Sequence, residues 1–243
     1  MIYGQGCDKQ SLRMVDVSGN YRRILDHINE AAARSGRKAQ EIKLLAAAKS
    51  QSVELIRAAV DAGVRLIGEN YVQEAREKKQ TIATPLEWHM IGHLQRNKVK
   101  VAVDLFDVIE TLDNAALARE LEKEGRKRNR IIRTLIEVSL AGEESKSGIP
   151  KGEVAALVSA VAELSHIKVE GLMTVPPFRE NLEEVRPYFR ELRVLKEELQ
   201  HLQIPNVNLH ELSMGMTHDY AVAVEEGATI VRIGTALFGP RRI

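Results

Sequence analysis

The amino-acid sequence predicts an α/β protein built as a single (β/α)8 TIM barrel with an extra N-terminal helix. Eight short apolar runs are separated mostly by segments with helical periodicity. The runs are continuously apolar rather than alternating, as expected of strands that are buried on both faces. After the leading segment, the chain averages about 26 residues per strand and connection, which suits a β/α repeat.

The first helix is expected over residues 16–34, because apolar residues from Tyr21 to Ile28 recur at helical spacing and Gly36 ends the pattern. Residues 1–15 are polar and interrupted by glycines, so we expect a flexible leader there. No Gly/Ser/Pro-rich linker divides the rest of the chain. Residues 16–243 are therefore expected to form one barrel domain.

The remaining elements are predicted from apolar runs and from the capping and helix-breaking residues at their ends. Ser52 and Gly63, for example, mark the start and the end of the helix that follows the first strand. The expected strands cover residues 42–48, 64–68, 87–91, 105–110, 131–139, 167–173, 208–212 and 229–233. The expected helices between them cover residues 53–62, 71–80, 115–126, 151–164, 182–202 and 220–226.

The composition of the chain excludes several classes of function. The chain has 35 Lys+Arg and 34 Asp+Glu residues, a formal net charge of +1, and 4% aromatic residues. We therefore expect no nucleic-acid partner and no attraction to an anionic membrane. One cysteine excludes an internal disulfide framework and a multi-cysteine zinc site. No apolar stretch approaches the roughly 20 residues that span a bilayer, and a signal-peptide pattern is absent, which predicts a cytoplasmic protein.

In a (β/α)8 barrel, functional residues gather at the carboxyl ends of the strands. Lys49 ends the first apolar run, behind three alanines. A lysine at the barrel mouth would be partly desolvated, which favours the free amine that forms a Schiff base. The alternative is a lysine whose amine simply reaches solvent from a strand end.

Other polar residues follow the second and third strands. Asn70 could cap the next helix, or its amide could face a ligand over the barrel mouth. His89 and His93 are four residues apart, but no carboxylate or cysteine stands at a familiar ligand spacing, so we expect no metal site. His93 is the better candidate for the edge of a pocket.

Two loops at the other side of the barrel have the composition of an anion site. The seventh strand is followed by Ser213, Met214, Gly215 and Thr217, and the eighth contains Arg232 and is followed by Gly234 and Thr235. Phosphate sites in these barrels frequently lie in the loops after strands seven and eight, although glycine and hydroxyl residues also suit ordinary turns.

A lysine opposite an anion site suits a ligand with an aldehyde and a phosphate, either pyridoxal 5′-phosphate (PLP) or a sugar phosphate in a Schiff-base aldolase. Residues 139–149 form a polar loop with two glycines and three serines, which we expect to be mobile. Lys146 in this loop could provide a second amine that receives the aldehyde; a solvated loop lysine is the alternative.

Seven segments in order resemble the pyridoxal phosphate homeostasis protein family, single-domain relatives of the alanine racemase barrel. The resemblance spans roughly Ile42 to Gly239 and leaves out the leader. The matching segments are Leu44–Lys49, Gly68–Glu74, Trp88–Gln95, Gly142–Gly148, Gly171–Thr174, Leu212–Met216 and Val231–Gly239.

The resemblance implies a role for each candidate residue toward PLP. Lys49 would form the Schiff base, Asn70 would lie beside the cofactor, and Arg232 would face the pyridine nitrogen. The phosphate would be held by Ser213, Gly234 and Thr235, with backbone help from the segment that contains Met214, Gly215 and Thr217. Thr217 stands where many relatives have serine, so the hydroxyl is retained.

The resemblance also bears on activity. A permanently charged Arg232 opposes ring protonation and makes the ring a poorer electron sink. Related racemases use a second base, a tyrosine from an extra domain and a partner subunit, and this chain ends four residues after Gly239. We therefore expect a monomeric, non-enzymatic PLP carrier or buffer in vitamin B6 and amino-acid homeostasis, with apo PLP enzymes as possible recipients. The alternatives are a PLP-dependent racemase or decarboxylase, and an aldolase without PLP.

Overall fold

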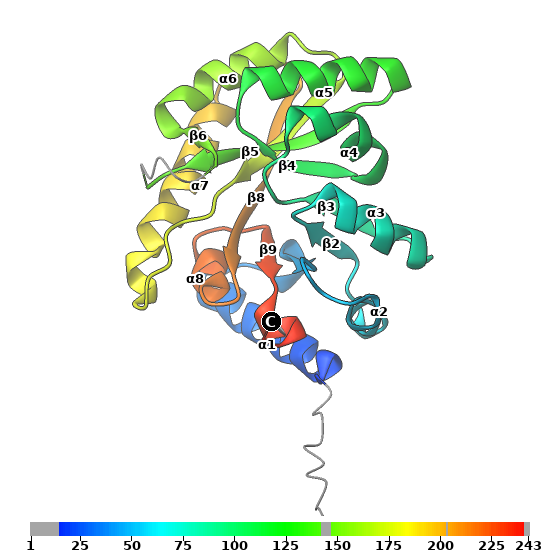
Figure 1. Cartoon of the computed structure of the whole chain (residues 1–243). Coiled ribbons are helices and arrows are strands. Elements are labelled where there is room, and N and C mark those ends of the chain that lie inside the picture. The colour runs from blue at the N-terminus through cyan, green and yellow to red at the C-terminus, as the bar shows by residue number, and fades with distance from the viewer. Residues whose placement is uncertain (1–14, 142–146, 203, 241–243) are drawn as a thin grey trace, which may run out of the picture.

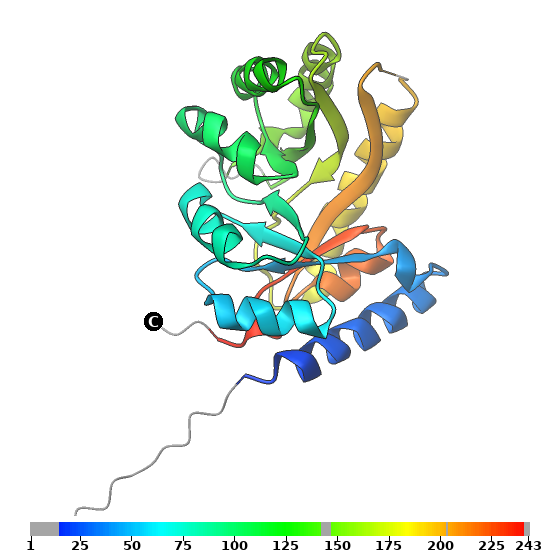
Figure 2. The same cartoon turned by 90° about the vertical axis from the view of Figure 1, so that its right-hand side faces the viewer.

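The structure is a computed structural model that describes residues 15–141, 147–202 and 204–240 (Figures 1 and 2). Its strands are β1 (Lys43–Ala47), β2 (Leu66–Glu69), β3 (Glu87–Met90), β4 (Val108–Leu112), β5 (Ile132–Ser139), β6 (Ile149–Pro150), β7 (Ile167–Met173), β8 (Val207–Met216) and β9 (Ile230–Ile233). Its α-helices are α1 (Val17–Arg34), α2 (Val53–Ala62), α3 (Val72–Thr81), α4 (Val99–Leu105), α5 (Ala115–Arg128), α6 (Val154–Ala162), α7 (Arg186–Gln200), α8 (Tyr220–Glu225) and α9 (Thr235–Phe238). Short 3-10 turns lie at η1 (Ala39–Glu41), η2 (Arg96–Lys98), η3 (Lys151–Glu153) and η4 (Leu182–Glu184).

Eight parallel strands close into a barrel, in the order β1-β2-β3-β4-β5-β7-β8-β9 and back to β1. The two-residue β6 pairs only with β5, outside this ring. Helices lie around the outside of the strands (Figure 1). The predicted (β/α)8 barrel with a preceding helix is therefore confirmed.

Two strands differ most from the sequence prediction. Residues 105–110 were expected to form a strand, but α4 ends at Leu105 and β4 begins at Val108. The Val-Lys-Val-Ala-Val pattern of α4 alternates as a strand does, and its helical face is visible only in the burial of Val99, Ala102 and Val103. The strand expected over residues 208–212 is longer, because β8 continues to Met216.

Helix α1 joins the two ends of the domain. Asp16 caps it by accepting a hydrogen bond from the Gly19 N–H (2.8 Å). Asn20 Nδ2 donates to the Leu237 carbonyl (2.9 Å), and α1 packs on α2, α8 and α9 (Figure 2). Among the described residues, no helix is long and apolar enough to cross a bilayer.

The inside of the barrel changes from charged to apolar to charged along its axis. Near the amino ends of the strands, Arg133 pairs with Glu87 and Glu170, both at 2.7 Å. Above this layer, Leu45 and Leu135 belong to a small apolar group that packs separately from the main core between sheet and helices. A second set of buried charged groups follows at the carboxyl ends, where the functional site is expected.

The close pairing of β7 and β8 makes one glycine essential. A Cβ atom at Gly171 would lie 2.2 Å from the backbone oxygen of Glu211, the residue it pairs with. We expect Gly171→Ala to lower the free energy of unfolding by about 1–3 kcal/mol, because the backbone must move. Gly152→Ala is the matched control: nothing lies within 4 Å of its Cβ position, and a change within about 0.5 kcal/mol is expected. Equal urea midpoints for the two variants would contradict this packing.

Candidate functional site at the barrel mouth

Strand order brings the predicted site residues together. Lys49 follows β1, and its neighbouring strands are β2, which leads to Asn70, and β9, which leads to Gly234. Ala46 of β1 pairs with Ile233 of β9, so the two chain segments that follow are side by side. Strand β8, next to β9, brings Gly215 to the same rim. Four loops, far apart in sequence, thus share one face of the barrel.

The amine of Lys49 is at this face. The residue is half-buried, and its Nζ atom lies 5.4 Å from the centroid of the Tyr71 ring. Its side chain makes no hydrogen bond or ion pair with any residue that the structure describes. This amine is therefore held beside an aromatic face and is available to a ligand.

A buried lysine supports the segment that carries Lys49. Lys78 of α3 is 7% exposed and donates to the Ala48 carbonyl (2.8 Å), Glu69 Oε1 (2.7 Å) and Glu74 Oε2 (3.0 Å). Burial raises the pKa of Glu69 to about 7, against the opposing effect of Lys78. The network ties α3 to the carboxyl ends of β1 and β2.

The residue after Lys49 is held from the same helix. Ser50 has a φ of 59°, a left-handed conformation that costs free energy for a residue other than glycine. Its backbone N–H donates to Glu74 Oε2 (2.9 Å). The backbone of Lys49 is therefore fixed on both sides, by Lys78 at Ala48 and by Glu74 at Ser50. Neither Lys78 nor Glu74 was predicted from the sequence, because the polar pattern of α3 is typical of a solvated helix.

Arg232 is the centre of a buried polar chain inside the barrel. Its Nη1 donates to Ser213 Oγ (2.8 Å), and its Nη2 donates to the Thr174 carbonyl (2.8 Å). Ser213 Oγ in turn donates to Glu110 Oε2 (2.6 Å), and Glu110 Oε1 pairs with His89 Nδ1 (2.6 Å). Glu110 was not predicted as a site residue, although a carboxylate inside the apolar Val-Ile-Glu-Thr-Leu strand could have indicated it.

The charged groups of this hydrogen-bonded chain stabilise one another in their ionised forms. Burial alone would raise the pKa of Glu110, but His89, Arg232 and Ser213 lower it. Burial alone would lower the pKa of His89, but Glu110 and Glu87 raise it to about 9. Burial also lowers the pKa of Arg232, while Glu110, Glu137 and Asp219 oppose that effect. Arg232 thus remains a guanidinium cation whose direction is fixed by Ser213 and Thr174.

Ser213 is placed deeper than an anion-binding turn requires. It is fully buried, and its hydroxyl group donates its one proton in a hydrogen bond to Glu110 Oε2. A phosphate contact from this hydroxyl would require that bond to be given up. The phosphate role of Ser213 stays a prediction, and its observed contacts orient Arg232.

The anion-site loops meet at the rim. Gly215 has a φ of 89°, and a Cβ atom there would lie 2.5 Å from the Ala223 Cβ. Thr217 Oγ1 accepts a hydrogen bond from the Ala236 N–H (3.2 Å), which joins the turn after β8 to the start of α9. Gly234 and Thr235 lie at this junction, and Thr235 is exposed.

Met214 does not share this exposure. Its side chain is fully buried in the core, so only its backbone could contribute to a site.

Asn70 does not cap the following helix. The cap position of α3 is Tyr71, and the Asn70 side chain makes no hydrogen bond to the described residues. A Cβ atom at Gly92 would lie 2.5 Å from the Asn70 carbonyl oxygen, so the segments that follow β2 and β3 approach closely here. The capping role expected of Asn70 is therefore not observed, and its role toward a ligand stays a prediction.

The two histidines of the third strand are in different environments. His89 is buried against Glu110, whereas His93 lies beyond the strand with most of its side chain exposed, 3.8 Å from Asp113. Among the described residues, no three His, Cys, Asp or Glu side chains form a cluster suited to a metal ion.

The loop after β5 is only partly described. Lys146 lies outside the described residues. Ser147 Oγ donates to Glu137 Oε1 (2.6 Å), and Glu137 Oε2 is buried without a hydrogen-bond partner in the described part of the chain. Burial raises the pKa of this carboxyl group. Glu137 is a further residue that the sequence analysis missed.

The His89–Glu110 pair predicts a pH dependence of stability. Because the pKa of His89 is raised from 6.5 to about 9 on folding, its stabilising contribution is complete below pH 6.5 and is lost as the pH rises through about 9. We expect the free energy of unfolding to fall over this range, and the fall to be absent in His89→Gln. Nitrogen NMR shifts of the His89 ring would test this directly; a neutral ring at about pH 7 would contradict the pairing.

Comparisons with known proteins agree with this architecture. The family model "Alanine racemase, N-terminal domain" matches residues 20–242. Alanine racemase from Clostridium difficile has the same fold, with a TM-score of 0.72 at 13% identity, over 93% of this chain and 58% of that one.

Closer relatives share sequence as well. The pyridoxal phosphate homeostasis protein of Aquifex aeolicus is 48% identical over 90% of this chain and 96% of its own length, and that of Escherichia coli K12 is 38% identical over 94% and 98%. The structure of PipY from Synechococcus elongatus with PLP bound has a TM-score of 0.80 and 34% identity, covering 92% of this chain and all of that one (100%). The chain therefore belongs to the pyridoxal phosphate homeostasis protein family.

Proposed function

We propose that this protein binds PLP reversibly through a Schiff base at Lys49 and carries or buffers it, without turning over amino acids. The observation that carries the proposal is the Lys49 amine, which has no ionic partner among the described residues and lies 5.4 Å from the Tyr71 ring centroid. Lys49 follows β1, the strand that lies between β2, which leads to Asn70, and β9, which leads to Gly234. PipY, a relative with the same fold, holds PLP. The cellular role would be vitamin B6 and amino-acid homeostasis in the cytoplasm, with apo PLP enzymes as recipients.

The residues at the mouth fit the parts of this cofactor. Bound PLP would supply an aldehyde that condenses reversibly with a primary amine. Lys49 would provide that amine, and the Asn70 amide would lie beside the ring. The Gly215 turn, Gly234 and Thr235 would supply backbone N–H groups and a hydroxyl to the phosphate.

Arg232 would limit the chemistry at this site. A guanidinium can only donate hydrogen bonds, and its contacts with Ser213 and Thr174 fix its direction. A fixed cation opposite the ring nitrogen opposes ring protonation, which weakens stabilisation of carbanions. This favours storage and transfer over catalytic turnover. The protein is proposed to act as a monomer.

One observation supports the second candidate, a PLP-dependent racemase-like enzyme. Tyr71 is 52% exposed and its ring lies 5.4 Å from Lys49 Nζ, so a phenol is near the amine. Racemisation needs two bases on opposite faces of the substrate, and the Tyr71 phenol would be the candidate for the second base. Steady racemisation of alanine by the purified protein, lost in Tyr71→Phe, would favour this alternative. A pure carrier gives no steady turnover.

The role of Lys49 is tested by its absorption spectrum and by reduction. Wild-type protein with PLP should show a visible band that borohydride converts into a covalent adduct on Lys49. Lys49→Ala and Lys49→Arg should form no adduct there, because neither side chain condenses with an aldehyde at neutral pH. Lys38→Ala, an exposed lysine before β1, is the control and should behave as wild type. Equal labelling of Lys49→Ala would contradict the proposal.

The support from α3 predicts a second effect. Glu74→Ala removes the acceptor of the Ser50 N–H and one partner of Lys78. We expect PLP to dissociate about tenfold faster, because the Lys49 backbone is no longer held. Glu74→Gln retains an acceptor and should restore most of the effect. Glu77→Ala, on the exposed face of the same helix, is the matched control. Identical dissociation rates for Glu74→Ala and Glu77→Ala would rule out this support.

A further inference from the structure

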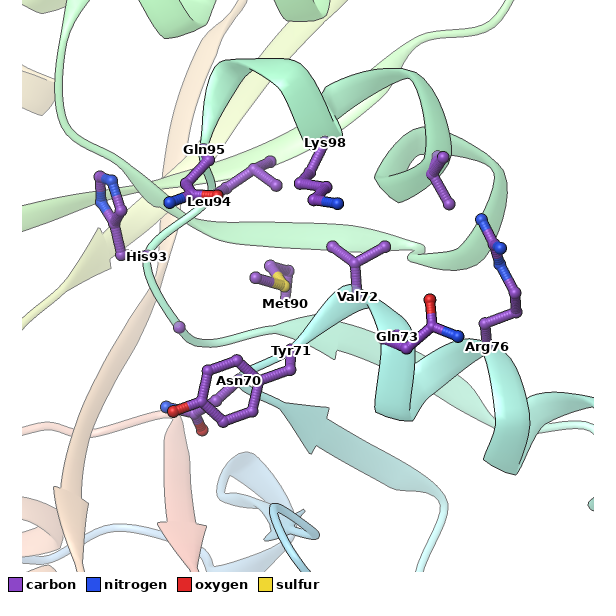
Figure 3. A pocket seen from close by; sticks show the side chains of 12 residues that line it. Asn70, Tyr71, Val72, Gln73, Arg76, Met90, His93, Leu94, Gln95 and Lys98 are labelled. Atoms are coloured by element: carbon purple, nitrogen blue, oxygen red, sulfur yellow. The ribbon is translucent and has the colours of Figure 1, made fainter.

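A cavity lies beside the proposed cofactor site. It has a volume of about 560 Å³ and lies between the start of α3 and the η2–α4 segment (Figure 3). None of the residues assigned to PLP lines it except Asn70. Its size falls within the range of pockets that hold small molecules.

The floor of this cavity is apolar. Met90 and Leu94 are buried, and Val72 and Val101 complete the apolar lining. The side chains of Met90 and Val72 lie near the middle of the close-up view (Figure 3). A ligand with an apolar body would remove this surface from water, at about 25 cal/mol per Å².

The polar part of the lining is cationic. Arg76 and Lys98 both face the cavity, and no aspartate or glutamate lines it. Within the described part of the chain, neither side chain lies within 4 Å of a carboxylate. Gln73 and Gln95 add amide groups to the same lining.

The contrast with a neighbour on the same helix is informative. Lys78, two residues after Arg76, is paired with two carboxylates and a carbonyl. Arg76 and Lys98 have no such partners among the residues that the structure describes, and they line the same cavity. Charge complementarity therefore points to an anionic ligand.

We propose that this cavity binds a small amphipathic organic anion, a phosphate monoester or a carboxylate. The anionic group would lie between Arg76 and Lys98, and the apolar body would rest on Met90 and Leu94. This goes beyond the proposed PLP site, since it needs neither Lys49 nor Arg232.

The two sites share one wall. Asn70 and Tyr71 line the cavity, and the Tyr71 ring also lies beside Lys49 Nζ. An anion in the cavity therefore contacts the residue that packs against the proposed PLP lysine. A ligand in the cavity would therefore change the affinity of the protein for PLP through Tyr71.

The test uses 1-naphthyl phosphate and 1-naphthoate as probes and neutral 1-naphthalenemethanol as their counterpart. Calorimetric titration of full-length protein preloaded with PLP should show saturable 1:1 binding of an anionic probe. The double variant Arg76→Gln/Lys98→Gln should weaken it by at least about tenfold, because charge-assisted contacts are lost. The neutral probe should bind at least about tenfold more weakly than the better anion. The stronger of the two anionic probes identifies the preferred group.

Lys100→Gln is the matched control, since it removes a lysine from α4 that does not line the cavity. It should bind the probes as wild type does. Absence of saturable binding at millimolar probe, equal binding by the double variant, or equal binding of the neutral probe would each overturn the proposal. Repeating the titration without PLP separates the two sites. Binding that PLP abolishes would mean that the probe occupied the cofactor site, whereas failure to load PLP leaves this test intact.

Discussion

Closure of the eight-stranded ring is the constraint on which the rest of the structure depends. The pairing of β9 with β1, with Ala46 beside Ile233, joins the end of the domain to its beginning. Through it the segments that contain Lys49 and Gly234 leave the barrel side by side, although 185 positions separate these two residues in the sequence. Helix α1 reinforces the closure, because Asn20 bonds the Leu237 carbonyl. A site assembled from strand ends is only as precise as this register.

Buried charge at the mouth gives the site its chemical character. Placing Arg232, Glu110 and His89 inside a barrel carries a large desolvation cost, which the hydrogen-bonded chain through Ser213 offsets. Each hydrogen bond in this chain fixes the orientation of the side chain that follows. The result is a cation whose position and charge are set by the fold rather than by solvent. The same logic applies outside the barrel, where Lys78 is matched to Glu69 and Glu74.

The sequence predicted the barrel and the residues at its mouth, but not the buried side chains that hold those residues in place. Apolar runs ending in Lys49, Asn70 or Gly215 were visible, because polar or glycine residues at strand ends break a simple pattern. Helix α4 was missed, because its alternating valines look like a strand. Lys78 and Glu74 were missed for a different reason: the only apolar residues of α3 are Val72 and Ala75, and only the packed structure shows which of its charged side chains is buried. The cavity at Arg76 and Lys98 is lined by two segments that are separate in the sequence, α3 and η2–α4, so no local sequence pattern predicts it.

The central claim is that Lys49 and Arg232 define two ends of one PLP site. A crystal structure of the protein grown with PLP tests it most directly. The account predicts continuous density from Lys49 Nζ to the cofactor, the Arg232 guanidinium at the pyridine nitrogen, and the phosphate at the Gly215 and Gly234 loops. A cofactor bound elsewhere, or one with its phosphate against Arg232, would contradict the account.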